Sequence, residues 1–76
     1  MMKVDANDIR ELSDYHMYID DCNDDTAPDR MFEYGELVLI KELIDKNILV
    51  ADKEYIEILD DLISKYITEL TELGCL

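Results

Sequence analysis

The residues whose types and spacing could bind a metal ion are crowded into the segment DDCNDD, near the end of the first third of the chain. Asp21, Asn23 and Asp25 match the opening D-x-N-x-D of a calcium-binding EF-hand loop. That loop also needs a glycine at its sixth position and a glutamate at its twelfth, and here those positions hold Thr26 and Phe32. We therefore expect no functional metal site, although weak, non-specific binding of divalent ions to the cluster stays open.

The chain offers little for covalent or cofactor chemistry. Zinc takes three or four ligands at close spacing, and His16 with two distant cysteines, Cys22 and Cys75, does not supply them. The carboxylates around Cys22 disfavour its reactive thiolate form. The two glycines, Gly35 and Gly74, lie too far apart for a phosphate-binding loop. We therefore predict a non-enzymatic protein without a cofactor, with both thiols reduced and His16 hydrogen-bonded at the edge of a core.

The composition describes a folded domain with a strongly negative charge. The chain has 20 acidic and 7 basic residues, a net charge of −13, and 49% hydrophobic residues. This charge repels nucleic acids and anionic membranes and favours basic partners. No signal peptide is visible in the first ten residues, and no apolar run approaches the roughly 18 residues of a membrane span. We expect one acidic helical domain, residues 1–76, in the cytoplasm.

The elements that position these residues are clearest at the C-terminus. Apolar residues recur there at steps of three and four, which predicts a helix over about 53–73. Asp52 is a suitable N-cap and Gly74 a suitable residue just beyond the C-terminal end. The predicted inner seam consists of Ile56, Leu59, Ile63, Tyr66, Leu70 and Leu73, widened by Leu62 and Ile67.

A second helix is predicted over about 27–46. Thr26 and Asp29 fit a capping box, Pro28 is tolerated in a first turn, and Asn47 suits a left-handed ending. Its apolar arc is broad and comprises Leu37, Leu39, Ile40, Leu43, Ile44 and Phe32, with Met31 and Val38 on another side.

So broad an apolar surface indicates either a central helix or a helix with one face in the core and another against a partner. Gly35, in the helix interior, either allows a close helix crossing or marks a break. Because the predicted third helix also offers a continuous seam, we expect a homodimer.

The connection NILVAD, residues 47–52, is short, so the second and third helices should fold back as an antiparallel hairpin whose end is plugged by residues 48–50. A first helix is predicted over about 8–22, capped by Asn7, with Ile9, Leu12, His16 and Ile19 on its inner side. The expected fold class is all-α, a small three-helix bundle with this antiparallel C-terminal helical hairpin and the first helix packed across it. The alternative leaves the first segment extended or partly disordered.

The outer side of the first helix carries carboxylates every three or four residues, which form one stripe. Residues 1–29 hold nine acids and two bases. In size and charge the chain resembles small phage- or plasmid-encoded inhibitors, such as anti-CRISPR and anti-restriction proteins that mimic DNA. This resemblance implies docking on the Lys- and Arg-rich cleft of a nucleic-acid-binding protein, where carboxylates pair with arginine. The candidate partner-binding residues are Asp8, Glu11, Asp14, Tyr18, Asp20, Asp21, Asp24 and Asp25.

Two other functions stay open from the sequence. One is a structural or regulatory helical homodimer without mimicry, in which the negative surface only keeps the protein soluble. The other is an antitoxin or immunity-type partner protein.

Overall fold

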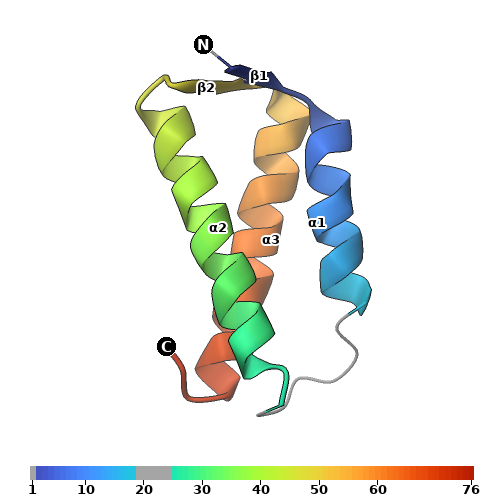
Figure 1. Ribbon diagram of the computed structural model, residues 1–76, viewed down its shortest axis with the longest axis vertical. Coiled ribbons are helices and arrows are strands. Elements are labelled where there is room, and N and C mark those ends of the chain that lie inside the picture. Colours follow the sequence, from blue (N-terminus) through green and yellow to red (C-terminus); the bar gives the residue numbers. More distant parts are fainter. Residues whose placement is uncertain (1, 19–24) are drawn as a thin grey trace.

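The computed structural model describes residues 2–18 and 25–76 as a mostly helical molecule with one short pair of strands (Figure 1). The expected helical fold class holds, but the strand pair was not expected. The elements in chain order are β1 (Met2–Val4), α1 (Ala6–Tyr18), α2 (Ala27–Asp45), β2 (Leu49–Ala51) and α3 (Lys53–Glu72).

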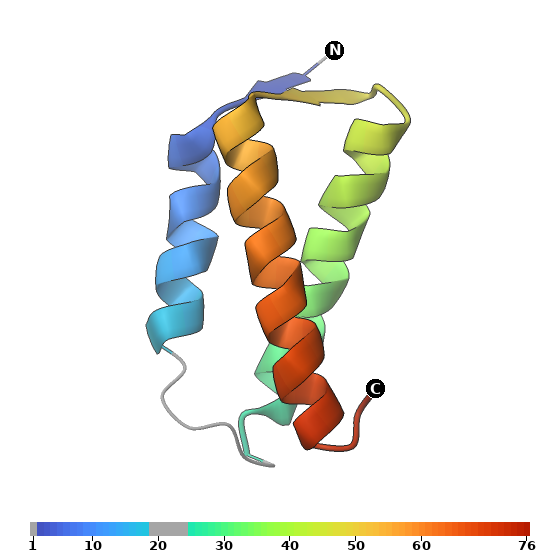
Figure 2. The same cartoon turned by 180° about the vertical axis from the view of Figure 1, so that it is seen from behind.

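Helix α3 is the central helix, and α1 and α2 each pack against it (Figure 2). Ile9 of α1 and Leu37 of α2 are fully buried against it. Of the two interpretations of the second helix, the one that makes it the central helix is wrong. Phe32 and Leu39, part of its broad apolar arc, are 66% and 56% exposed, because α3 is the main helix that packs against α2.

The buried side of α3 is rotated from the predicted seam. Ile56 and Ile63 are only partly buried, and Ile67 is 40% exposed. The cause is that α3 is covered from two directions, so the centre of its buried side falls between its two neighbours. The buried positions of α3 are Tyr55, Leu59, Leu62, Tyr66 and Leu70.

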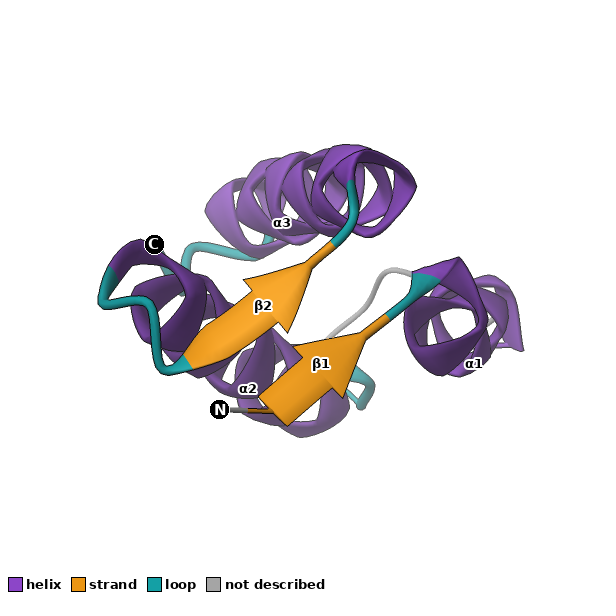
Figure 3. Ribbon diagram, turned by 90° about the horizontal axis from the view of Figure 1, so that it is seen from above, coloured by secondary structure: helices purple, strands orange, loops and turns teal. Residues whose placement is uncertain are grey.

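The two strands lie across one end of the helices (Figures 1 and 3). They pair in parallel, with Met2 opposite Leu49 and Val4 opposite Ala51. Leu49 is buried, whereas Ile48 and Val50 are largely exposed, so only one of the three residues expected to plug the core does so. Alternation along a strand explains this, because successive side chains point to opposite faces.

Three of the predicted helix ends are confirmed. The Asp52 carboxylate accepts a hydrogen bond of 2.8 Å from the backbone N–H of Tyr55 at the start of α3. Asn47, with φ of 60°, follows the end of α2, and Gly74, with φ of 78°, follows the end of α3. Both sit in the left-handed conformation that lets the chain leave a helix while satisfying its last carbonyl groups.

The N-cap predicted for α1 is wrong, because the helix begins at Ala6, earlier than expected. The Asp5 carboxylate accepts a hydrogen bond from the N–H of Asn7 at 2.9 Å, and the N–H of Asp5 donates to the Asp8 carboxylate at 2.8 Å. Asp5 is therefore the N-cap of α1, the role that the sequence analysis assigned to Asn7. The predicted end of this helix, near residue 22, lies outside the described residues.

The predicted capping box of α2 is also wrong. Thr26 has near-helical backbone angles, φ −98° and ψ −2°, and makes no side-chain capping bond. Its hydroxyl instead accepts a hydrogen bond from the Arg30 guanidinium. Pro28 does stand in the first turn, as expected.

Candidate functional site

The outer side of α1 presents an acidic stripe, defined here as Asp8, Glu11, Asp14 and Tyr18. All four side chains are exposed, and Tyr18 is 80% exposed. Ile9, on the opposite side of the helix, is fully buried in the core. A helix that buries one side must turn residues three and seven positions apart on the other side toward solvent. The stripe therefore follows directly from the way that α1 packs on α3.

The ion pairs among the described residues leave this stripe uncompensated, because every one of them ends on a carboxylate of α3. Glu11 and Asp14 take part in none of these pairs. The pairs are Arg10–Glu54 (2.8 Å), His16–Glu69 (2.7 Å), Arg30–Glu69 (2.6 Å), Lys41–Asp60 (2.9 Å), Lys65–Asp61 (2.9 Å) and Lys53–Glu57 (4.0 Å). The acids of α3 are thus mostly paired, by bases of α1 and α2 and by two lysines of α3 itself. Glu11 and Asp14 on α1, like the acids of α2, form no ion pair among the described residues.

The predicted partner-binding residues fall into three groups in the structure. Glu11, Asp14 and Tyr18 are exposed on α1, and Asp25 is exposed just before α2. Asp8 is exposed too, but its carboxylate also closes the N-terminal turn of α1. Asp20, Asp21 and Asp24, together with most of DDCNDD, lie outside the described residues.

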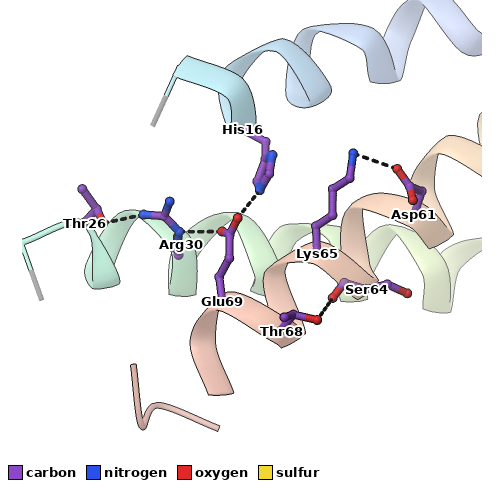
Figure 4. A network of polar contacts seen from close by, with 8 residues as sticks. All are labelled: His16, Thr26, Arg30, Asp61, Ser64, Lys65, Thr68 and Glu69. Carbon is purple, nitrogen blue, oxygen red and sulfur yellow. Dashed lines mark hydrogen bonds and ion pairs between the residues drawn. The ribbon is translucent and has the colours of Figure 1, made fainter. Parts of the chain in front are cut away.

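A polar cluster that sequence reasoning missed joins all three helices (Figure 4). Glu69 of α3 accepts a hydrogen bond from Arg30 Nε of α2 and pairs with His16 Nε2 of α1. The Arg30 side chain is only 3% exposed, and those of His16 and Glu69 are 15% and 21% exposed. The three positions are far apart in sequence, so no spacing rule could connect them. The one available signal was a charged residue at a helix position turned toward the core.

The electrostatics of this cluster indicate a structural role. Burial acts to raise the pKa of Glu69, but the hydrogen bonds from Arg30 and His16 outweigh it and hold the pKa below its usual range. The His16 ring also meets the Tyr66 ring edge-on, with centroids 4.9 Å apart. The prediction that His16 is a hydrogen-bonded residue at the core edge is confirmed.

Two buried polar atoms have no hydrogen-bond partner among the described residues: the Tyr66 hydroxyl and Glu33 Oε2. Burial, reinforced by the charges of Glu33 and Glu69, raises the pKa of Tyr66 far above its usual range. Burial also raises the pKa of Glu33, and repulsion from Glu36 and Asp29 adds to this effect. Folding therefore shifts both groups toward their neutral forms.

The surface hollow on α3 offers no converging reactive groups. It measures about 270 Å³ and is lined by Ser64, Lys65, Thr68 and Glu69. Figure 4 shows that Thr68 donates to the Ser64 carbonyl group, at 3.0 Å, and that Lys65 pairs with Asp61, so three of the four side chains, with Glu69, are already engaged. Within residues 2–18 and 25–76, no three His, Cys, Asp or Glu side chains gather into a group that could hold a metal ion.

Cys75 is an exposed free thiol, and Cys22 lies outside the described residues. No helix in the described part of the chain combines the length and the apolar character that crossing a membrane requires. Comparisons with protein-family models, with curated proteins and with solved structures each found no match.

Proposed function

We propose that this protein is a non-enzymatic inhibitor or modulator that docks the acidic stripe of α1 on a basic, nucleic-acid-binding partner protein. The observation that carries the proposal is the unpaired negative charge of Glu11 and Asp14 on the solvent side of α1, next to a central helix whose acids are largely paired. An exposed helix with uncompensated carboxylates meets arginine and lysine side chains without first breaking internal ion pairs.

The spacing of the stripe suits a partner that normally holds nucleic acid. Asp8, Glu11 and Asp14 follow each other at three-residue intervals, an axial rise of about 4.5 Å per step. One strand of duplex DNA presents a phosphate every ~3.4 Å along the axis. A row of carboxylates at similar spacing can therefore pair with successive lysine and arginine side chains in a phosphate-binding cleft.

The scaffold supports this use because it holds α1 at both ends. The β1–β2 pairing and the Arg10–Glu54 ion pair fix its first turns, and the His16–Glu69 pair fixes its last turn. A preorganised helix loses little conformational freedom on binding. In the arrangement we propose, α2 and α3 form an antiparallel hairpin that carries α1 in the cytoplasm, or in the host cytoplasm if the protein is phage-encoded.

One observation favours a second candidate function, a structural or regulatory homodimer. The outer side of α2 is apolar and exposed, with Phe32 66% and Leu39 56% exposed. A dimer through this side does not exclude docking through α1.

The proposal is tested by capturing partners from a lysate of the native host with three immobilised proteins. These are the wild type, the stripe variant Glu11→Gln/Asp14→Asn, and a control, Glu57→Gln/Glu72→Gln, that removes the same charge from exposed positions of α3. We expect the wild type and the control to retain a basic nucleic-acid-binding protein at low salt, and duplex DNA to displace it. Equal recovery by the stripe variant contradicts the proposal.

A further inference from the structure

The outer face of α2 is an apolar surface that this chain leaves uncovered. Met31, Phe32, Val38 and Leu39 are 41%, 66%, 37% and 56% exposed, whereas Leu37 on the other side of the helix is completely buried. Met31 and Val38, and likewise Phe32 and Leu39, are seven positions apart and so lie on the same side of the helix, and the two pairs are neighbours along it. We call them, with Gly35, the outer face of α2.

Gly35 stands in the middle of this face and makes no close contact with the other described residues. It is exposed, and a Cβ atom built on it would meet nothing within 4 Å. Its φ is not positive, so no left-handed backbone requires a glycine there. Glycine in a helix interior is unfavourable relative to alanine, and here no contact of the monomer offsets that. The described part of the monomer thus gives no reason for a glycine at this position.

We propose that a second copy of this chain packs antiparallel on the outer face of α2, with Leu39 of each copy seated over Gly35 of the other. The exposed positions of this face, continued to both helix ends, recur at steps of four and three, the spacing of a helix-pairing seam. If residue i lies opposite residue 74 − i, every seam position faces another seam position. The seam consists of Pro28, Phe32, Gly35, Leu39, Glu42 and Lys46.

This register matches large side chains with small ones and favours a second copy over an unrelated helix. In the symmetric pair, Leu39 of each copy packs on Gly35 of the other. Because glycine has no side chain, the two helix backbones can approach closely there. Phe32 faces Glu42, whose aliphatic stem can cover the ring while its carboxylate reaches solvent. A twofold interface needs such self-complementarity, because each contact occurs twice.

The charges along the seam also suit an antiparallel copy. Lys46 is exposed and forms no ion pair among the described residues. Antiparallel packing brings it beside the first turn of the partner copy's α2, where Asp29 stands, and sets the two helix dipoles in opposite directions. Glu36 lies next to the symmetry axis, so the Glu36 carboxylates of the two copies stand near each other at the edge of the interface and repel. Because each copy carries a net charge of −13, the overall repulsion outweighs the attraction between Lys46 and Asp29, and we expect the dimer to tighten as salt is added.

The dimer is independent of the docking proposed for α1. Figure 3 shows α1 and α2 on different sides of α3, so pairing through α2 leaves the acidic stripe open. Each dimer then presents two acidic stripes, and a partner with two basic clefts would gain avidity from both.

Sedimentation equilibrium of the full chain, from roughly 1 to 200 µM, tests the interface. We expect the wild type to reach dimer mass in this range and Leu39→Glu to stay monomeric. Met17→Glu, which adds the same charge at a residue that is 77% exposed on α1, is the control and should dimerise like the wild type. A wild type that is monomeric throughout, or a Leu39→Glu variant that dimerises normally, overturns the proposal.

Gly35→Ala separates an interface effect from a folding effect. Because its Cβ meets nothing in the monomer, the variant should melt about 4–8 °C higher under dilute, monomeric conditions. The same methyl group blocks the seat of Leu39, so the dimer dissociation constant should rise at least about tenfold. A more stable monomer that dimerises as tightly as the wild type would refute the proposed register.

Discussion

Glu69 pairs with side chains from two other helices, His16 of α1 and Arg30 of α2. Because Arg30 is buried, removing the Glu69 carboxylate should lower the stability of the fold substantially. Glu69→Gln should lower the free energy of unfolding by about 2–4 kcal/mol at pH 7, because it removes the charge of a carboxylate that pairs with a guanidinium only 3% exposed. The control is Asp60→Asn, which breaks the more exposed pair with Lys41 and should cost less than about 1 kcal/mol. Urea unfolding measures both, and equal losses would contradict the structural role of the cluster.

The pH dependence of the Glu69 contribution follows from the sign of its pKa shift. The folded protein holds the pKa of Glu69 below its ordinary value. This stabilisation is therefore fully present above the ordinary glutamate pKa and is lost as the pH falls through the lowered value. The difference between wild type and Glu69→Gln should accordingly shrink in acid.

Glu33 is predicted to behave in the opposite way. Burial, with repulsion from Glu36 and Asp29, raises its pKa on folding, so folding favours the protonated form. Stability should therefore fall as the pH rises from the unfolded-state pKa through the raised folded-state value. Glu33→Gln stays neutral and should be more stable than the wild type at pH 7, with a smaller difference near pH 4. Identical pH profiles of unfolding would refute this.

At the scale of elements, the start of α1 rests on Asp5. Asp5→Ala removes the acceptor for the N–H of Asn7 and should cost about 1 kcal/mol of stability, the usual value for an N-cap. Asn7→Ala, at the position where the sequence had predicted the cap, removes only an exposed bond from Arg10 and should cost less. Denaturant unfolding of both variants decides which residue is the cap, and a larger loss for Asn7→Ala would contradict the structure.

The sequence predicts local features of the elements well and tertiary features poorly. Asp52, Asn47 and Gly74 mark helix ends because capping depends on a few neighbouring residues. The β1–β2 pair could not be read, because each strand has three residues and the partners are 47 positions apart. The central position of α3 could not be predicted from the sequence either, since the second helix has the broader apolar surface.

The same division applies to the candidate site. A period of three to four residues was enough to place Glu11, Asp14 and Tyr18 together on an exposed side of α1. It could not show that the ion pairs of the described residues would all fall on α3, because Arg10, Lys41 and Arg30 find acids that are distant in sequence. The contrast between a paired central helix and an unpaired α1 is visible only in the folded chain.

At the scale of the whole molecule, a net charge of −13 opposes folding through self-repulsion. Salt screens this repulsion, so the melting temperature should rise between about 50 and 500 mM sodium chloride. Circular dichroism at a fixed low protein concentration measures this without a contribution from dimerisation. A constant or falling melting temperature would mean that local ion pairs outweigh the net charge.

The most direct test of the acidic stripe is the rate at which the protein associates with a captured basic partner. Carboxylates that steer docking act mainly on the association rate and lose their effect as salt increases. Stopped-flow or surface binding should compare the wild type with Glu11→Gln/Asp14→Asn and with Glu57→Gln/Glu72→Gln. We predict that the stripe variant associates about 3- to 10-fold more slowly than the control at low salt, and that the two converge at high salt. Equal association rates at low salt, with both variants folded, would show that α1 is not the docking surface.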